Sequence, residues 1–437
     1  MSTADFSHYV DPTKVPRLSK ADCRMSLEAF PPFLERLLGI WAPLSREPFR
    51  GITADGTMVS DVFGFRSEGA PAAAAAEAAH RWLNALDPAI RSQVCFPVDS
   101  GLWRHWHNTP LILRNPQVEL LDLPMPLREL ALELVRVSLS PEGYRRTREV
   151  MASNLFLGRL IDMTEVLNEW AFTVSIFGTP SAVEPWGWQL FGHHLALNCL
   201  FIGEQMMLSP VFMGLEPDHD HGPEHRRFFE PHEACALRLF RALNDAERSK
   251  AVLYGSMLTA DQPPGRYHPD DGRQLGGAFQ DNRVVPYEGL SVGGLDRQQK
   301  RLLLELAELF ICNLPSGPAE ARMREIEHYL DETRFAWIGP ADDVNPFYFR
   351  IHNPVALIEF DHHSGIFLAN EDPARFHVHT IVRTPNGGDY GFDLLRQHYA
   401  KGGHDRAHAN HGHDEHNHGH ADGAHSHDGG QTYHRHK

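Results

Sequence analysis

The amino-acid sequence predicts an α+β fold with an antiparallel β-sheet core and segregated helices, followed by a disordered histidine-rich C-terminal tail. Helical periodicity dominates the chain up to Trp170, where β-branched and aromatic stretches begin. Helices return after residue 230, and a second β-rich block follows from Pro346. Helix blocks and strand blocks that follow one another, rather than alternate, are typical of the α+β class.

The helices are predicted from apolar residues at helical spacing. Residues 1–70 should form a partly helical N-terminal arm, with one helix over residues 25–38 that Pro31 and Pro32 interrupt. Ser140 before Pro141 is a typical helix N-cap. Helices are expected over residues 70–86, 126–137, 141–170, 231–243, 245–258, 297–313 and 319–330.

The strands are predicted in the two β-rich blocks. The first block should contain a strand over residues 171–177 and a hairpin of two strands, 186–202 and 205–213, joined at Gly203 and Glu204. The second block should contain strands over residues 346–351, 355–361 and 376–383. Residues 259–294 are predicted to be a long loop, and no internal repeat is recognised. The α+β core domain is expected to span residues 71–401.

Composition and charge limit the classes of partner. The 437 residues carry 41 Lys and Arg against 57 Asp and Glu, a formal net charge of −16. This balance disfavours nucleic acid and anionic membranes, because phosphate binding requires a basic surface. No apolar run reaches the roughly 20 residues of a membrane span, and the first 18 residues do not resemble a signal peptide. Five scattered cysteines exclude a disulfide framework, so a cytoplasmic location is expected.

The segment over residues 376–383 contains the most informative candidate site. Side chains alternate along a strand, so His377, His379 and Arg383 should share one face. Two histidines at this spacing hold their imidazoles side by side, which is a common way to bind a metal ion. The alternative is a half-exposed sheet face where both histidines meet water.

The neighbouring strands add further polar side chains to this face. Arg350 and His352 share one face of their strand, and Glu359 and Asp361 share one face of the next. If these strands pair, the side chains converge with His377 and His379. Such a patch is costly to bury unless it binds a ligand. A structural ion-pair network is the alternative.

A second candidate lies in the first β-rich block, where His193 and His194 are adjacent. On one continuous strand only one of the two can face a given site. His194 shares the face of Asn198 and is the better candidate ligand, whereas His193 is predicted to be a hydrogen-bonded interior histidine. The predicted metal ligands are therefore His377 and His379, with His194 or His352 as the third.

Residues 402–437 have a distinct composition. They contain 11 of the 29 histidines, between His404 and His436, together with Gly, Asp and Ala and almost no apolar residue. Such a segment should be disordered and should bind divalent metal ions weakly through neutral imidazoles. A solvating tail without a selected role is the alternative.

Several long motifs from residue 186 onward carry a family resemblance. They include Trp-Gly-Trp-Gln and Gly-His-His-Leu-Ala-Leu-Asn over residues 186–198, and further stretches at residues 210–217, 348–354, 358–360, 377–383 and 389–399. With these motifs the chain resembles the domain-of-unknown-function 3500 family of bacterial and fungal proteins, from about residue 103 to residue 399. Phe376 departs from the asparagine usual there. The resemblance implies a shared site but supplies no reaction.

The leading hypothesis is a metal-dependent enzyme, most simply a hydrolase that acts on a small carboxylate-bearing or carbonyl substrate. Glu359 would be the general base or would orient a ligand, and Arg350 and Arg383 would hold an anionic group of the substrate. Zinc is the favoured cofactor, and iron, nickel, copper and manganese remain open. The alternatives are a non-haem metal oxygenase, a non-catalytic divalent-metal binding or storage protein, and a metal-free module that binds anions.

Overall fold

The computed structural model describes residues 6–401, except residues 12, 16, 28, 114–117, 220–226 and 269–270. The tail predicted over residues 402–437 lies outside the described residues. The chain divides into two units, Met1–Arg396 and Gln397–Lys437, and the sheet and the candidate site belong to the first. The predicted boundary at residue 70 stays a prediction.

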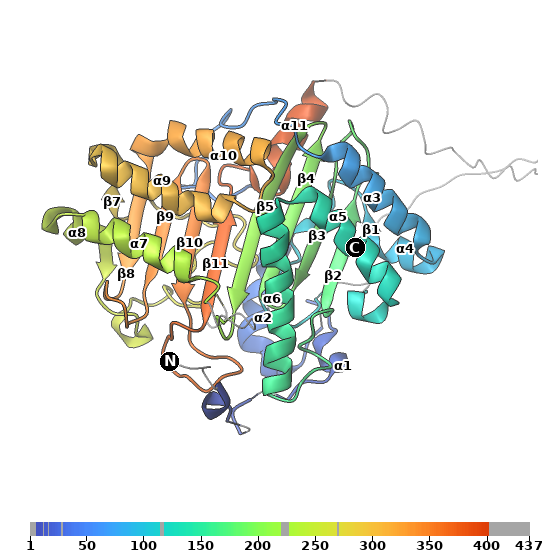
Figure 1. Cartoon of the computed structure of the whole chain (residues 1–437), viewed down its shortest axis with the longest axis horizontal. Coiled ribbons are helices and arrows are strands. Elements are labelled where there is room, and N and C mark those ends of the chain that lie inside the picture. Colours follow the sequence, from blue (N-terminus) through green and yellow to red (C-terminus); the bar gives the residue numbers. More distant parts are fainter. Residues whose placement is uncertain are drawn as a thin grey trace, which may run out of the picture. The chain divides into compact units, whose positions relative to one another are not determined.

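One sheet of 11 strands forms the centre of the first unit within the described residues (Figure 1). Its order is β1-β2-β3-β4-β5-β11-β10-β9-β8-β6, and β7 pairs with β8. All pairs are antiparallel except the short edge pairs β1–β2 and β6–β8. The strands are β1 (Cys95–Phe96), β2 (Phe172–Phe177), β3 (Trp186–Gly192), β4 (Leu195–Ile202), β5 (Gln205–Leu215), β6 (Val252–Tyr254), β7 (Leu290–Ser291), β8 (Arg334–Ile338), β9 (Tyr348–Asn353), β10 (Ala356–His362) and β11 (Val378–Arg383). The predicted α+β class is confirmed.

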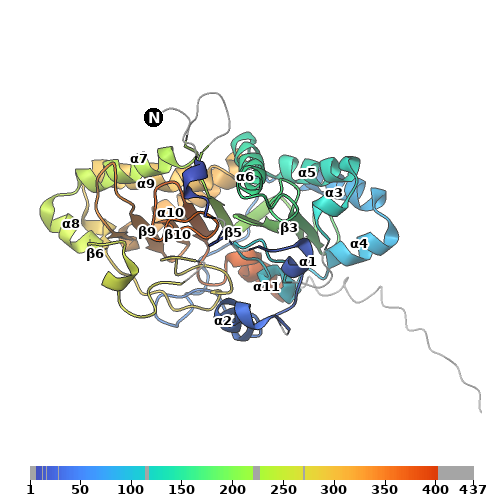
Figure 2. The same ribbon diagram turned by 90° about the horizontal axis from the view of Figure 1, so that it is seen from below.

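Helices α3, α5, α6, α7 and α9 lie along one face of this sheet, whereas α1 and α2 lie on the opposite side (Figure 2). None of the helices in the described part of the chain combines the length and apolar content that a membrane crossing requires. The helices are α1 (Lys20–Cys23), α2 (Glu35–Ser45), α3 (Ala72–Ala85), α4 (Pro88–Val94), α5 (Met125–Ser138), α6 (Pro141–Leu160), α7 (Glu230–Ala242), α8 (Asp245–Ala251), α9 (Arg297–Ile311), α10 (Ser316–His328) and α11 (Phe392–Ala400).

The two faces of the sheet differ in chemistry, because neighbouring residues of a strand point to opposite sides. On the helix side, Trp188 and Phe349 belong to one large apolar core that also contains Leu134 of α5 and Leu237 of α7. The other face carries buried polar side chains of β3, β4, β9, β10 and β11. The loop before α9 covers part of this polar face, since the backbone N–H of Leu275 donates to a carboxylate there. The candidate site lies on this polar side.

The first unit contains an internal repeat of topology that sequence analysis did not recognise. In the first half, α3, α4 and β1 precede α5, α6 and the antiparallel run β2–β5. In the second half, α7, α8 and β6 precede α9, α10 and the antiparallel run β8–β11. The register repeats as well: Gln189 pairs with Asn198 across β3 and β4, and Arg350 pairs with Glu359 across β9 and β10. The two halves meet at the β5–β11 pair, where Val211 lies opposite Val382.

Matching backbone details support the repeat. Gly178 follows β2 with φ of 80°, and Gly339 follows β8 with φ of 94°, a conformation that favours glycine. Their N–H groups donate to Phe96 of β1 at 2.8 Å and to Tyr254 of β6 at 2.9 Å. A short sequence trace also survives, because Ala-Leu-Asp-x-Ala-x-Arg-Ser at residues 85–92 recurs as Ala-Leu-Asn-x-Ala-x-Arg-Ser at residues 242–249.

Several predicted elements differ from the structure. The helix expected over residues 25–38 is a 3-10 turn, Pro32–Leu34, followed by α2. The long helix expected to reach residue 170 ends at Leu160, because the chain folds back until the Leu167 backbone packs against Gly158. The helix over residues 245–258 ends at Ala251, and strands β1, β6, β7 and β8 were not predicted. These elements are short or partly exposed, so their periodicity is weak.

A candidate three-histidine metal centre

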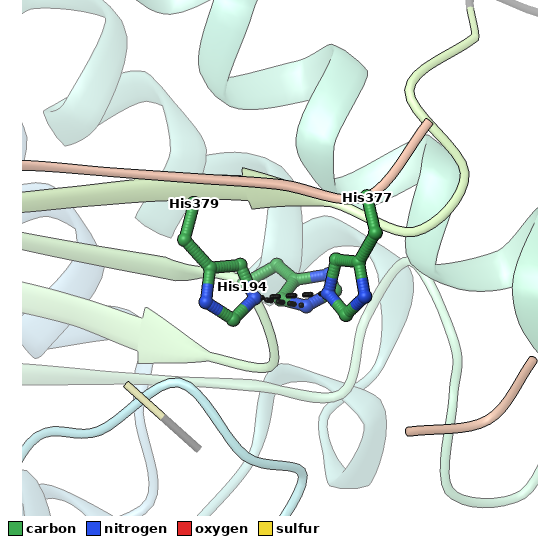
Figure 3. Close-up of side chains that lie close together, drawn as sticks. All are labelled: His194, His377 and His379. Atoms are coloured by element: carbon green, nitrogen blue, oxygen red, sulfur yellow. Dashed lines mark hydrogen bonds between the residues drawn. The ribbon is translucent and has the colours of Figure 1, made fainter. Parts of the chain in front are cut away.

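Three buried histidines from distant parts of the chain converge on the polar face of the sheet. The Nε2 atoms of His377 and His379 lie 3.0 Å apart, and those of His379 and His194 lie 3.2 Å apart. His377 and His379 extend from one chain segment toward the His194 ring (Figure 3). This group is the candidate metal-ligand cluster found among the described residues.

The sheet positions His379 and leaves room for its ring. His379 is in β11 and pairs with Gly214 of β5. A Cβ atom on Gly214 would stand 2.9 Å from Cδ2 of His379 and 3.3 Å from Cδ2 of His194. A glycine inside a strand often marks such a close approach. Gly214 therefore has a positioning role that the sequence analysis did not assign, although the interior glycine was a signal for it.

His194 belongs to a tight turn rather than to a strand. β3 ends at Gly192 and β4 begins at Leu195, so the single strand predicted over residues 186–202 is wrong. His194 has φ of 61°, a conformation that costs a non-glycine residue roughly 1–2 kcal/mol. The Gly214 N–H donates to the His194 carbonyl at 2.8 Å and fixes the turn. Strained residues of this kind cluster at functional sites.

The turn also separates the two adjacent histidines. His193 Nδ1 lies 2.9 Å from Oδ1 of Asn154, and the His193 ring stacks on the His194 ring at 3.9 Å between centroids. Strand parity does not distinguish the two histidines, because β3 ends at Gly192 and neither histidine lies on a strand. The structure nevertheless places His194 in the cluster and His193 in a buried hydrogen bond behind it.

The electrostatic environment keeps the three imidazoles neutral. Burial lowers the pKa of His194, His377 and His379 well below the usual value, and the neighbouring histidines lower it further. Neutral imidazole is the form that binds metal ions. Glu216 Oε1 lies 3.6 Å from Nδ1 of His377. Burial raises the pKa of Glu216 to about 7, although three backbone N–H groups oppose the shift.

Two of the three nitrogen–nitrogen separations match those between ligands of a divalent metal ion. Two nitrogens at 2.0–2.1 Å from a tetrahedral ion stand about 3.3 Å apart, and neighbouring ligands of an octahedral ion about 2.9 Å apart. The observed separations of 3.0 and 3.2 Å lie in this range. Nδ1 of His377 and of His379 have no hydrogen-bond partner among the described residues. Glu216 Oε1 lies just beyond hydrogen-bond distance of the His377 ring and accepts hydrogen bonds from the backbone N–H groups of Ile366 and Leu368.

Two other predicted site residues, Glu359 and His352, lie on the same sheet face but outside this cluster. Glu359 accepts hydrogen bonds from the N–H groups of Leu275 and Gly276 and from the Tyr348 hydroxyl at 2.5 Å. His352 pairs with residues of β8 and β10, and its ring lies 4.6 Å from the Tyr287 ring. Burial lowers the pKa of His352 to about 3. Neither residue lines the cavity beside the three histidines.

The two predicted substrate-binding arginines are engaged in ion pairs. Arg350 binds Glu288 at 2.7 Å. Arg383 binds Asp281 at 2.7 Å and Asp389 at 2.9 Å, and all three side chains are fully buried. These carboxylates raise the pKa of Arg383 above its usual value although burial opposes the shift. The catalytic roles of Arg350, Arg383 and Glu359 stay predictions.

An apolar cavity of about 220 Å³ lies next to the three histidines. Among the residues that line it, none is Asp, Glu, Lys or Arg. Its walls come from the arm, from the segment before residue 112, from the β3–β4 turn and from the β10–β11 connection. The lining residues are Leu18, Leu34, Leu37, Asn108, Thr109, Pro110, Leu111, His193, His194, Ile366, Phe367 and His379.

Fold and site thus define an α+β protein with a candidate three-histidine metal centre beside an apolar cavity. The model of the family described as "Protein of unknown function (DUF3500)" matches residues 68–392, and the chain belongs to this family. The predicted resemblance is confirmed. Neither the comparison with curated proteins nor that with solved structures gave a match. All three histidines, Gly214 and Glu216 lie inside the matched region.

Proposed function

We propose that this protein is a metal-dependent enzyme whose single metal ion is bound by His194, His377 and His379. The convergence of the three Nε2 atoms, with His379 at 3.0 and 3.2 Å from the other two, supports the proposal. Catalytic metal sites commonly have three protein ligands and keep a position open, whereas structural sites are closed by four. Here the open side would face the apolar cavity, because His194 and His379 form part of its wall.

The reaction we propose first is hydrolysis of a carbonyl compound, with zinc as the favoured ion. When bound, the ion would activate water and polarise a carbonyl group. Glu216 would hold the His377 ring through Nδ1, and Asn108 and Thr109 would contact polar substrate atoms from the cavity wall. This arrangement requires no contribution from the ion-paired arginines.

A second candidate is a non-haem metal oxygenase. The described lining of the cavity offers no carboxylate that could act as a general base, and it is mostly apolar. Both features suit oxidation of an apolar substrate, and three imidazoles also suit iron or copper. The identity of the bound metal and the consumption of oxygen would separate the two reactions.

Metal analysis tests the proposal. The chain ending at Gly402, purified without an affinity-metal column, should retain about one equivalent of a transition metal. His194→Ala, His377→Ala and His379→Ala should each lose that equivalent, whereas His352→Ala should keep it. Metal that is bound only by the full chain would favour the storage alternative, with binding at the tail. A full equivalent in all three variants would refute the proposed centre.

A further inference from the structure

We infer that the substrate of this centre is a small amphiphilic molecule, with one oxygen group that binds the metal and an uncharged apolar body that fills the adjacent cavity. The position of the oxygen group rests on the proposed function. The apolar body is inferred from the cavity alone. The body is proposed to be one aromatic ring with a short substituent, or a branched hydrocarbon group of similar size.

The size of the cavity limits the body. An apolar cavity of about 150 Å³ is sufficient to bind benzene, and drug-sized pockets begin at roughly 300 Å³. A cavity of about 220 Å³ therefore accommodates a single ring and a few further atoms. Only a part of this size of a larger molecule would be enclosed by its walls.

The distribution of charge around the cavity indicates where the charged and the uncharged ends of the substrate would bind. No charged side chain is among the lining residues, so a charged body would lose its hydration without gaining a partner. Three neutral imidazoles, in contrast, leave the full charge of a divalent ion uncompensated. An anionic oxygen group would therefore bind at the metal, not at Arg350 or Arg383, whose guanidinium groups already bind carboxylates.

The N-terminal arm completes the wall that the body would contact. Leu18, Leu34 and Leu37 line the cavity, and all three precede the family-matched residues 68–392. The arm is anchored there by a second apolar cluster, in which Leu38 and Trp41 are fully buried and which also includes Leu111 and Phe367 of the matched region. The metal ligands thus belong to the region shared with the family, whereas part of the substrate-facing wall belongs to the arm. We assign the arm a role in selecting the apolar body.

A first experiment tests the cavity without metal. Binding of toluene to the full-length, metal-free chain is measured by ligand-observed NMR for wild type, Leu37→Phe and Ile366→Trp. Both substitutions enlarge a side chain that lines the cavity and should weaken binding at least about fivefold. Ile40→Phe is the matched control, because Ile40 is an exposed residue of the same helix that does not line the cavity. Equal binding by all four proteins, or no binding by wild type, would overturn the inference.

A second experiment tests both ends of the molecule. The full-length chain loaded with one equivalent of zinc is titrated with benzohydroxamate and with acetohydroxamate, which share the metal-binding group. The phenyl group should tighten binding on the order of 100-fold, and Leu37→Phe should reduce this preference without weakening acetohydroxamate. Equal affinities for both ligands would overturn the inference but leave the metal centre standing. Absence of bound zinc, with toluene still bound in the cavity, would overturn the proposed function and leave the apolar site standing.

Discussion

Removal of His379 should abolish the stabilisation of the fold by metal, because its Nε2 is the atom that approaches both other ligands. A ligand that binds only the native state stabilises it by about 4.1 kcal/mol when its free concentration is 1,000 times its Kd. The entropy of unfolding is about 2.1 cal/mol/K per residue, or about 0.8 kcal/mol/K for the 396 residues of the first unit. Metal should therefore raise Tm by about 5 °C.

The assay is calorimetry of the chain ending at Gly402, with and without zinc, for wild type, His379→Ala and His352→Ala. Each protein is compared with itself, so the cost of replacing a buried histidine cancels from the metal-induced shift. His352 is the matched control, since it is equally buried on the same sheet face but outside the cluster. Wild type and His352→Ala should show the shift, and His379→Ala should not. A shift of about 5 °C in His379→Ala, or its loss in His352→Ala, would refute the reasoning.

Three further predictions concern residues around the centre. Glu216→Gln should weaken metal affinity roughly 10–100-fold, as removal of a carboxylate behind a ligating histidine does elsewhere, measured by competition with a chelator. Gly214→Ala should weaken it as well, because the added methyl group would push the rings of two ligands away. Asp281→Asn should destabilise the fold by about 3–5 kcal/mol in urea unfolding, since it leaves the buried Arg383 with one carboxylate fewer. The control is Asp331→Asn, at an exposed ion pair, which should change stability and metal affinity little. Although burial opposes the shift, Arg383 and Arg104 hold the pKa of Asp281 below its ordinary value. The contribution of Asp281 to the free energy of unfolding is therefore present above the unfolded-state pKa. It is lost as the pH falls through the lower folded-state pKa. Stability that did not fall in acid more steeply for wild type than for Asp281→Asn would contradict this.

Local sequence pattern was sufficient for two of the three candidate ligands. Alternation along a predicted strand placed His377 and His379 side by side, and their Nε2 atoms do lie 3.0 Å apart, although β11 begins only at Val378. The third ligand was named with the wrong geometry, because strand-like sequence lies directly on both sides of the two-residue turn between Gly192 and Leu195. Its approach to His379, 185 residues away in sequence, depends on the pairing of β5 with β11. That contact joins the two halves of the repeat, and no local period encodes it.

The same limit explains why the polar face was read as a single site. Strand parity correctly assigned Arg350, Glu359 and His379 to one face, but parity says nothing about position along a strand. His379 pairs with Asp361, whereas Glu359 lies two residues earlier in β10 and pairs with Ile381. The Glu359 carboxylate instead accepts hydrogen bonds from the backbone of the loop that covers this face of the sheet. The sequence predicted which side each residue faces and could not predict which partners would reach it.

The internal repeat offers a direct test of whether Arg350 and Glu359 are structural. They occupy the positions that Gln189 and Asn198 occupy in the first half, where the Gln189 amide donates to the Asn198 side chain at 2.6 Å. In the second half the two opposite positions carry a charged residue each, although Arg350 is ion-paired with Glu288 and Glu359 accepts hydrogen bonds from Leu275, Gly276 and Tyr348. Replacing both residues together, as Arg350→Gln with Glu359→Asn, copies the neutral pair into the second half. If the two residues have only a structural role, the double variant should be more stable than either single variant, because each single change removes the opposite charge that lies across from the remaining buried one. It should also keep the metal and the hydroxamate affinities of wild type.

Wild-type stability and metal content combined with a loss of turnover would instead support the catalytic roles predicted from the sequence. That result would place the substrate's polar group over β9 and β10 rather than in the cavity beside His194.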